Sequence, residues 1–213
     1  MEIKDKESLL FFGNITQPQM NDVARMNKSF ESIYNYYVGD EFMYPSIEAS
    51  AKEIKELQSK VESQLVNPKE EYIEQDVNLM SYLTAEAEKL NISSSDNARA
   101  LFILKEKVDP FILALKNYWN RARPYQYAYF LKSDFHPLSA VSAHTPAYPS
   151  GHSIQVTSWG KMLEKKYPEL QTEISNIVYS VNQGRMALGV HFPSDIQFGV
   201  SIAQYLNNKG LLL

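Results

Sequence analysis

Apolar residues recur along most of the chain at intervals of three and four positions, with polar and charged residues between them. This spacing places the apolar side chains on one face of an α-helix. The pattern predicts helices near residues 17–37, 45–67, 68–90, 97–120, 150–166, 170–187 and 194–208. Strict alternation of apolar and polar positions, which indicates a half-buried strand, does not extend over a useful length. The sequence therefore predicts an all-α fold.

Two interruptions modify this pattern. Pro110 falls inside the segment 97–120, so either one helix kinks there or two helices meet. We favour two helices, with Pro110 in the first turn of the second. Between Pro124 and Pro149 the helical spacing disappears, and long ordered loops are often functional. We therefore expect a helical bundle whose functional site forms at helix ends together with an irregular loop.

The composition is that of an ordinary globular protein. The chain has 213 residues, of which 44% are hydrophobic and 22% are charged. This is enough for one domain with a full core, so we expect a single domain over 1–213, with N-terminal helices at 15–92 packed on the rest. The formal net charge of −4 argues against affinity for nucleic acids or anionic membranes, because both depend on a basic surface. Any anion site must therefore be local.

Cysteine usage and apolar runs narrow the picture further. The chain has no cysteine, which excludes disulfides, thiol nucleophiles and thiolate metal sites. The apolar run within residues 8–13 is shorter than the apolar region of a secretory signal, about 7–15 residues. No run approaches the roughly 18 residues of a membrane-spanning helix. We expect a cytoplasmic protein without an integral membrane segment, or a periplasmic or secreted one if the chain is a processed form.

The first segment with candidate chemistry is rich in cations. Lys116, Asn120 and Arg123 follow one another at i, i+4 and i+7, so they share one face if the helix persists to Pro124, which would end it. Basic residues late in a helix often only complement the helix dipole. Arg121 is expected to be solvated. The segment therefore offers a cationic face whose meaning depends on its neighbours.

The second segment runs from Tyr148 to His152. Its proline fixes the entry to a helix, Ser150 can cap that helix, and Gly151 lets the backbone approach a ligand closely. Free backbone N–H groups at such a helix start attract phosphate, and His152 lies beside them. By itself the stretch favours a capped helix with a packed histidine.

The third segment places Arg185, His191 and Asp195 at spacings of six and four. His191 precedes a helix that starts near Pro193, and Asp195 is close enough in sequence to orient its ring. Arginines bind phosphoryl oxygens bidentately, while a lysine and helix-start amides complete a cradle. With one histidine to attack and another to protonate the leaving oxygen, the three segments together suit phosphoryl transfer.

These three segments resemble the signature of the type 2 phosphatidic acid phosphatase superfamily. That superfamily includes bacterial class A acid phosphatases and vanadium-dependent haloperoxidases. Its signature is Lys with Arg-Pro after six residues, then Pro-Ser-Gly-His, then Ser-Arg, five residues, His, three residues and Asp. Ten positions match in order and at those spacings, between Lys116 and Asp195. Without a spanning segment, the chain is most similar to the soluble branch that contains the acid phosphatases.

The resemblance implies roles for individual residues. His191 would form a phosphohistidine, Asp195 would orient it, and His152 would be the general acid. The phosphate would be held by Lys116, Arg123, Ser150, Gly151 and Arg185. No metal is implied, and the partner is a small-molecule phosphoester. One position departs from the signature, because Gly184 stands where a serine is expected, which puts a secondary contact to phosphate in doubt.

The resemblance leaves the activity open. We expect a metal-independent phosphatase, a phosphoric ester hydrolase acting on a phosphomonoester or, less favoured, a diphosphate. A vanadium-dependent haloperoxidase would use the same oxyanion site, with vanadate as cofactor and His191 as its ligand. A non-catalytic phosphate-binding protein is the third alternative. A surface with many tyrosines is compatible with a homodimer.

Some residues outside the signature are open to two interpretations. His136 and His144 either line the entrance of the site or are ordinary loop histidines, which we favour. The aromatic residues after Pro124 either wall a pocket for an apolar leaving group or pack against the core. They are Tyr125, Tyr127, Tyr129 and Phe130.

Overall fold

The computed structural model describes residues 11–13, 26–39 and 45–212. The N-terminal apolar run up to Leu10 and the first part of the expected helix 17–37 lie outside these residues. No β-strand occurs in the described part, where an isolated bridge joins Phe11 to Arg121. The all-α prediction is therefore confirmed.

The helices follow the apolar periodicity closely along most of the chain. In order they are η2 (Lys28–Phe30), α3 (Glu31–Tyr37), α4 (Ile47–Val66), α5 (Glu70–Val77), α6 (Leu79–Lys89), α7 (Ser94–Ile103), η3 (Leu104–Val108), α8 (Asp109–Trp119), α9 (Pro124–Phe130), α10 (Gly151–Lys166), η4 (Pro168–Leu170), α11 (Gln171–Ala187) and α12 (Pro193–Asn208). Among these, none is both long and apolar enough to cross a membrane.

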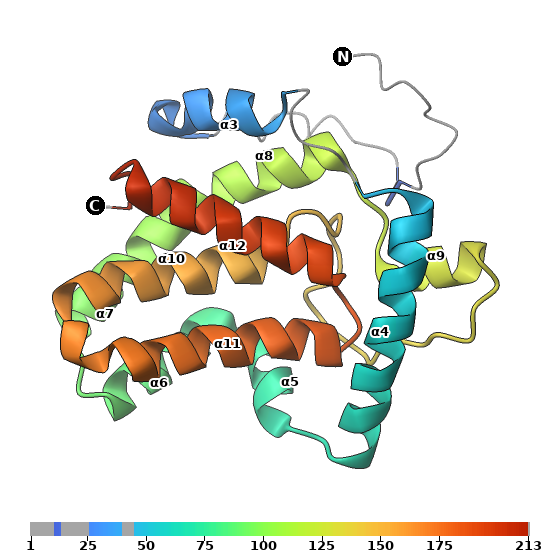
Figure 1. Ribbon diagram of the computed structural model, residues 1–213. Helices are drawn as coiled ribbons and strands as arrows, with labels where there is room; N and C mark the ends of the chain where they lie inside the picture. Colours follow the sequence, from blue (N-terminus) through green and yellow to red (C-terminus); the bar gives the residue numbers. More distant parts are fainter. Residues whose placement is uncertain (1–10, 14–25, 40–44, 213) are drawn as a thin grey trace.

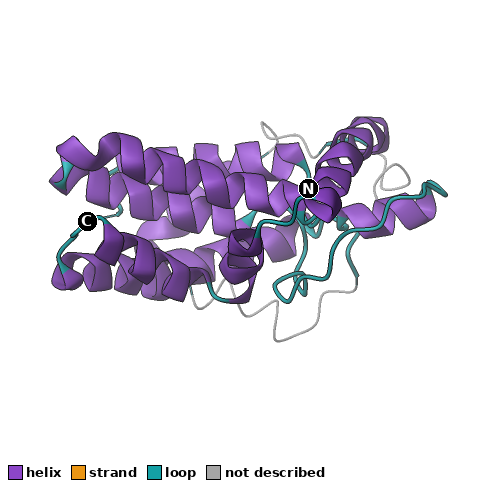
Figure 2. Ribbon diagram, turned by 90° about the horizontal axis from the view of Figure 1, so that it is seen from below, coloured by secondary structure: helices purple, strands orange, loops and turns teal. Residues whose placement is uncertain are grey.

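Helices α10, α11 and α12 form the centre of the bundle, and α10 packs against both of the others. The N-terminal ends of α10 and α12 lie at the same end of the bundle as the C-terminal ends of α8 and α11 (Figure 1). The irregular segments collect toward this end as well (Figure 2). The upright α4 contacts α9 and α11 there. The fold thus brings several helix ends and the long loop to one place.

The apolar stripes meet in one large core. Leu104, Leu115, Ile154 and Trp159 are among its fully buried members. Burying a large aliphatic or aromatic side chain contributes roughly 1.5–3 kcal/mol, so this cluster dominates the stabilisation of the bundle. The indole N–H of Trp159 donates to Asn97 Oδ1 at 2.8 Å, which satisfies the one polar atom of that ring. The core therefore fixes α7, α8 and α10 relative to one another.

The expected helix 68–90 is wrong as a single element. Asn78 has φ −155° and ψ 87°, which ends α5, and its side chain caps α6 by accepting a hydrogen bond from the backbone N–H of Ser81 at 3.0 Å. Asparagine competes for backbone hydrogen bonds in this way at helix ends. The break lets α5 pack on α11 independently of α6.

The region around Pro110 agrees with the preferred prediction of two helices. Helix α8 begins at Asp109 with Pro110 in its first turn, and a π-helical turn, η3, joins it to α7 without a loop. At its other end α8 stops at Trp119, because Asn120 is left-handed, with φ 46°. The helix therefore ends near Asn120 as predicted, and the condition for Lys116, Asn120 and Arg123 to share one helix face is not met.

The segment after Pro124 was expected to be irregular, and its first part is not. Pro124 starts the short helix α9, and the backbone N–H of Arg123 donates to Gln126 Oε1 at 2.8 Å across its first turn. Proline is well suited to the first position of a helix. The remainder, residues 131–149, forms the irregular loop of the prediction.

Candidate active site

Lys116 and Arg123 converge although they do not share a helix face. Lys116 is buried in the last turn of α8, and its ammonium donates to the carbonyl oxygen of Pro146. Arg123 lies beyond the break; its Nε donates to the Thr145 carbonyl at 2.8 Å. Asn120 instead donates to the Gly13 carbonyl at 2.6 Å, so it is not part of the cationic cluster. The turn at Asn120 replaces the expected helical register.

The start of α10 lies against these cations. Ser150 is its N-cap and accepts hydrogen bonds from the backbone and the hydroxyl of Ser153. A Cβ on Gly151 would come 3.3 Å from Ile112 and 3.4 Å from the Lys116 Cε. Glycine thus allows α10 to approach α8 closely. The N–H of Ser150 donates to the Asp195 carbonyl at 3.0 Å, which ties the second segment to the third.

His191 lies between Asp195 and Arg123. Its Nδ1 is 3.2 Å from Asp195 Oδ2, and its Nε2 is 3.0 Å from Arg123 Nη1. A guanidinium only donates, so these partners assign the ring proton to Nδ1 and leave the lone pair on Nε2. The neighbours of His191 therefore favour the tautomer in which Nε2 can attack an electrophile.

Asp195 has a second charged partner, Arg121, that the sequence did not reveal. Arg121 was expected to be solvated, but it is fully buried and its Nη1 forms an ion pair with Asp195 Oδ1. Its guanidinium lies 4.1 Å from the Phe192 ring centroid. The N–H of Phe192 donates to Asp195 Oδ2 at 2.8 Å. The expectation of a solvated Arg121 is wrong because the break at Asn120 turns this residue inward.

Glu53 of α4 completes this group of charges. It accepts hydrogen bonds from the backbone N–H and the hydroxyl of Ser194 at 2.7 and 2.8 Å. It also pairs with Arg121 Nη2 at 3.2 Å. The Glu53 side chain remains partly exposed, at 18%, whereas Arg121 and Asp195 are fully buried. We call Arg121, Asp195 and Glu53 the buried triad.

Arg185 has an unexpected partner in α5. Its Nη1 is 2.7 Å from Asp76 Oδ1, and its Nη2 donates to Ser142 Oγ at 2.7 Å. The N–H of Val141 donates to Asp76 Oδ2 at 2.6 Å, so Asp76 also anchors the irregular loop. Nε of Arg185 is buried without a hydrogen-bond partner among the described residues.

Gly184 explains how α5 reaches Arg185. A Cβ at this position would lie 2.7 Å from Gln75 Oε1 and 2.9 Å from Tyr72 Cδ1. Those distances are shorter than real Cβ contacts, so with a serine here the side chains of Gln75 and Tyr72, or α5 itself, would have to shift. The departure from the signature therefore has a packing reason, because glycine lets α5 lie close to α11.

Replacing Gly184 by serine should lower the free energy of unfolding by about 1–3 kcal/mol, the usual cost of overpacking. Helix propensity alone predicts the opposite sign, because glycine is the poorer helix former. Chemical denaturation of both proteins measures the difference. An unchanged or increased stability would show that α5 does not depend on this glycine.

Burial and repulsion between neighbouring cations lower pKa values in the site. Burial, followed by repulsion from Arg123, lowers the pKa of Lys116 well below its usual value. Burial and the charge of Arg185 lower the pKa of Arg123 to about 10. Burial alone would raise the pKa of Asp76, but Arg185 and the Ser142 hydroxyl outweigh it, so this pKa is lowered. An anion among the three cations would relieve their repulsion.

The two histidines share this positive environment. Burial and then the charge of Arg123 lower the pKa of His191 well below its usual value. Burial and then the charge of Arg185 do the same for the pKa of His152 in the first turn of α10. The backbone of Gln75 is a hydrogen-bond partner of His152. Helix α5 therefore contacts the site at two points.

A cavity of about 220 Å³ joins the three segments. Lys116, Arg123, Gly151, His152 and His191 line it. The other predicted site residues, Ser150, Arg185 and Asp195, do not line it. Asp195 contacts His191 and Arg185 contacts Ser142, both of which line the cavity, while Ser150 donates to the carbonyl of Asp195. Its size is below that of typical drug-sized pockets, about 300–1,000 Å³, so it suits a small ligand.

The remaining candidate residues lie elsewhere. Tyr127 is buried and packs edge-on against Phe192, with ring centroids 5.4 Å apart. Three aromatic residues of α9 are exposed and line a separate surface hollow: Tyr125, Tyr129 and Phe130. His144 is exposed, and His136 is exposed beside Asp134 at 3.3 Å, as expected of loop histidines. None of these residues lines the cavity of the site.

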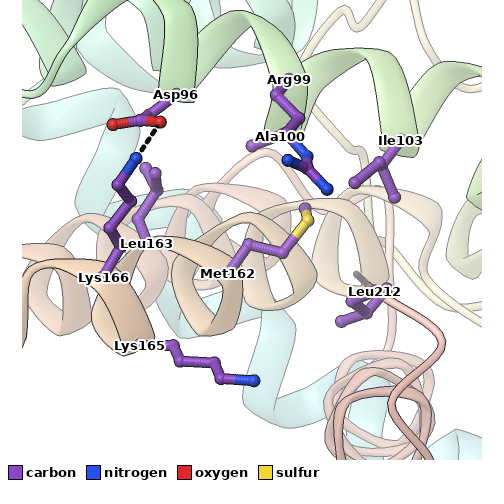
Figure 3. A pocket seen from close by; sticks show the side chains of 9 residues that line it. All are labelled: Asp96, Arg99, Ala100, Ile103, Met162, Leu163, Lys165, Lys166 and Leu212. Atoms are coloured by element: carbon purple, nitrogen blue, oxygen red, sulfur yellow. Dashed lines mark hydrogen bonds and ion pairs between the residues drawn. The ribbon is translucent and has the colours of Figure 1, made fainter.

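Another cavity, of about 360 Å³, lies between α7 and the far end of α10 (Figure 3). Lys166 and Asp96 form an ion pair at its edge, and Met162 and Leu212 are among its apolar lining. Met162 is about 15 Å along α10 from His152. This cavity is therefore separate from the candidate active site.

Comparison with known proteins identifies the family. The model of the PAP2 superfamily matches residues 108–206, a segment that contains all eight predicted site residues. The match confirms the resemblance, and residues 108–206 of the chain belong to the PAP2 superfamily. No sequence among the curated proteins matches the chain.

Two solved structures are similar to this one. A bacterial vanadium-dependent iodoperoxidase has a TM-score of 0.55 and 18% identity, covering 75% of this chain and 46% of its own. A transmembrane PAP2-type phosphatidylglycerolphosphate phosphatase from Bacillus subtilis has a TM-score of 0.40 and 19% identity. That match covers 90% of this chain and 91% of the phosphatase chain. The chain spans about half the length of the iodoperoxidase. At this identity the iodoperoxidase shows a shared fold.

Proposed function

We propose that the protein is a metal-independent phosphatase that hydrolyses a phosphomonoester through a phosphohistidine on His191. The observation that carries the proposal is the pairing of His191 with Asp195 at Nδ1 and with Arg123 at Nε2, beside a cavity lined by buried cations. Superfamily membership supports phosphatase or haloperoxidase activity. We also propose that the hydrolase is of the acid-phosphatase type.

The first step transfers the phosphoryl group to the enzyme. Nε2 of His191 attacks phosphorus, the bond to the leaving oxygen breaks, and His152 gives that oxygen its proton. Lys116 and Arg123, which line the cavity, neutralise the phosphoryl oxygens. Asp195 stabilises the positive charge that develops on the imidazole of His191.

The second step regenerates the enzyme. Water attacks the phosphohistidine, and His152, now neutral, accepts its proton. The bond between phosphorus and Nε2 breaks, which releases inorganic phosphate and restores the starting tautomer of His191. No group outside the chain is needed to balance either step.

Hydrolysis of p-nitrophenyl phosphate in the presence of a chelator tests the proposal. We expect turnover without added metal and inhibition by vanadate, whose trigonal bipyramidal form resembles the transition state. A purified protein that hydrolyses no phosphoester in a broad panel would contradict the proposal.

The same residues fit vanadate, so a haloperoxidase is the second candidate. Lys116 and Arg123 would hold the vanadate oxygens, and Nε2 of His191 would bind the vanadium. Bound vanadate would supply the activation of peroxide for halide oxidation. Iodide oxidation with peroxide and vanadate, without phosphoester hydrolysis, would favour this alternative.

The pH dependence follows from the lowered pKa values. His191 acts unprotonated, and its lowered pKa keeps it so into the acid range. His152 acts protonated, and its lowered pKa means that the free enzyme gains this proton only as the pH falls. We expect kcat/KM for the aryl phosphate to decrease between about pH 5 and about pH 8, approaching tenfold per unit. An alkaline optimum would contradict the assignment of His152 as the acid.

A further inference from the structure

The cavity contains one acidic side chain that the proposed reaction does not use. Asp109, at the start of α8, lines the same cavity as Lys116 and His152. It precedes Lys116 by seven residues, two helical turns, which puts the two on one side of α8 and about 10 Å apart along its axis. Asp109 therefore faces the space beyond the phosphate cradle.

The crossing of α8 and α10 places a second polar residue beside it. Gly151 packs against Ile112 and Lys116, and one turn further along α10 the amide of Gln155 donates to Asp109 Oδ1 at 2.7 Å. Gln155 also lines the cavity. The same contact between α8 and α10 that forms the cradle thus also forms this pair, which we call the Asp109–Gln155 pair.

The Asp109–Gln155 pair presents hydrogen-bond acceptors to the cavity. Gln155 donates through Nε2, which leaves its own Oε1 and Asp109 Oδ2 as acceptors. Among the described residues, no other hydrogen-bond donor is recorded for Asp109. Burial raises the pKa of Asp109 to about 6, against the hydrogen bond from Gln155 and the charge of Lys105. A partly buried carboxylate of this kind is stabilised by a donor from a ligand.

We propose that Asp109 and Gln155 form a leaving-group subsite that accepts a hydrogen bond from a hydroxyl or ammonium group of the substrate. This proposal rests on the proposed phosphatase function and names its substrate class: monophosphates of alcohols with a second polar donor. A terminal phosphate in that place would meet the carboxylate of Asp109, so diphosphates are disfavoured.

Matched substrates test the subsite directly. The test would compare ω-aminoalkyl, ω-hydroxyalkyl and n-alkyl phosphates of equal length. Chains of about two to five carbons match the two-turn separation of Asp109 and Lys116 along α8. At neutral pH the wild type should favour a donor-bearing ester over the alkyl ester by at least about tenfold in kcat/KM. The amino and hydroxy arms show which donor the subsite takes.

Asp109→Asn is the diagnostic variant, because it keeps the volume and the bond from Gln155 while removing the charge. A preference of about tenfold for the aminoalkyl ester should fall to about threefold, since charge-assisted hydrogen bonds are about twice as strong as neutral ones. Gln155→Leu is a second variant, which should also reduce the preference. Glu106→Gln, an exposed neighbour outside the cavity, is the matched control and should keep the wild-type preference.

The results separate the subsite from the proposed reaction. If all the esters are hydrolysed but donor and alkyl chains react equally well, the subsite is wrong and the phosphatase stands. The same result follows if Asp109→Asn keeps the full preference. If no ester is hydrolysed, the phosphatase is wrong, and calorimetry of the same compounds decides the subsite: tighter binding of donor chains supports it and equal binding overturns it.

Discussion

Replacing His191 by alanine should reduce kcat for p-nitrophenyl phosphate by at least about a thousandfold, because the variant lacks the atom that attacks phosphorus. Steady-state kinetics measures the loss. The helical content and thermal unfolding should remain close to those of the wild type. His144→Ala is the matched control, since His144 is an exposed loop histidine outside the cavity, and it should retain full activity.

The same variant distinguishes attack by His191 from attack by another residue or directly by water. A folded His191→Ala protein that still hydrolyses the ester would mean that the nucleophile is elsewhere or that water attacks directly. In that case the contacts of His191 with Asp195 and Arg123 would be structural.

Replacing Arg121 by methionine should lower the free energy of unfolding by about 3–5 kcal/mol, the usual cost of removing one partner of a buried ion pair. Methionine keeps much of the volume but leaves Asp195 and Glu53 of the buried triad without their cation. Activity should fall as well, because Asp195 would no longer be held in place against His191. Urea denaturation and steady-state kinetics measure the two effects.

Arg99→Met is the control for this loss of charge. Arg99 is exposed on α7, so the substitution should change the stability by no more than about 0.5 kcal/mol. A wild-type stability for Arg121→Met would contradict the view that the buried triad organises the site. A loss of stability with normal activity would limit its role to folding.

Much of the bundle could be predicted because the apolar periodicity is long and regular. Helices α4, α10, α11 and α12 begin and end within a few residues of the predicted limits. The signature residues could be found from spacing alone, and the structure gathers Lys116, Arg123, His152 and His191 around one cavity. Local patterns suffice wherever the residues concerned lie at or near helix ends.

The rest depends on contacts between distant parts of the chain. Asp76 and Glu53 are charged positions of the predicted helices 68–90 and 45–67 that no motif marks, and tertiary packing brings them to Arg185 and Arg121. The burial of Arg121 could not be predicted, because the left-handed conformation of Asn120 that turns it inward is not recognisable from helical spacing. Gly184 was visible in the sequence as a departure, but its packing against α5 was not.

Detection of a phosphoryl group on His191 during turnover is the most direct test of the proposed function. Reaction mixtures would be quenched at alkaline pH, where phosphohistidine survives, and the peptides would be analysed by mass spectrometry. We predict a phosphorylated peptide in which the modification maps to His191, and its absence from His191→Ala. Steady turnover with no phosphoryl group on His191 at any quench time, or with the group on another residue, would contradict the account.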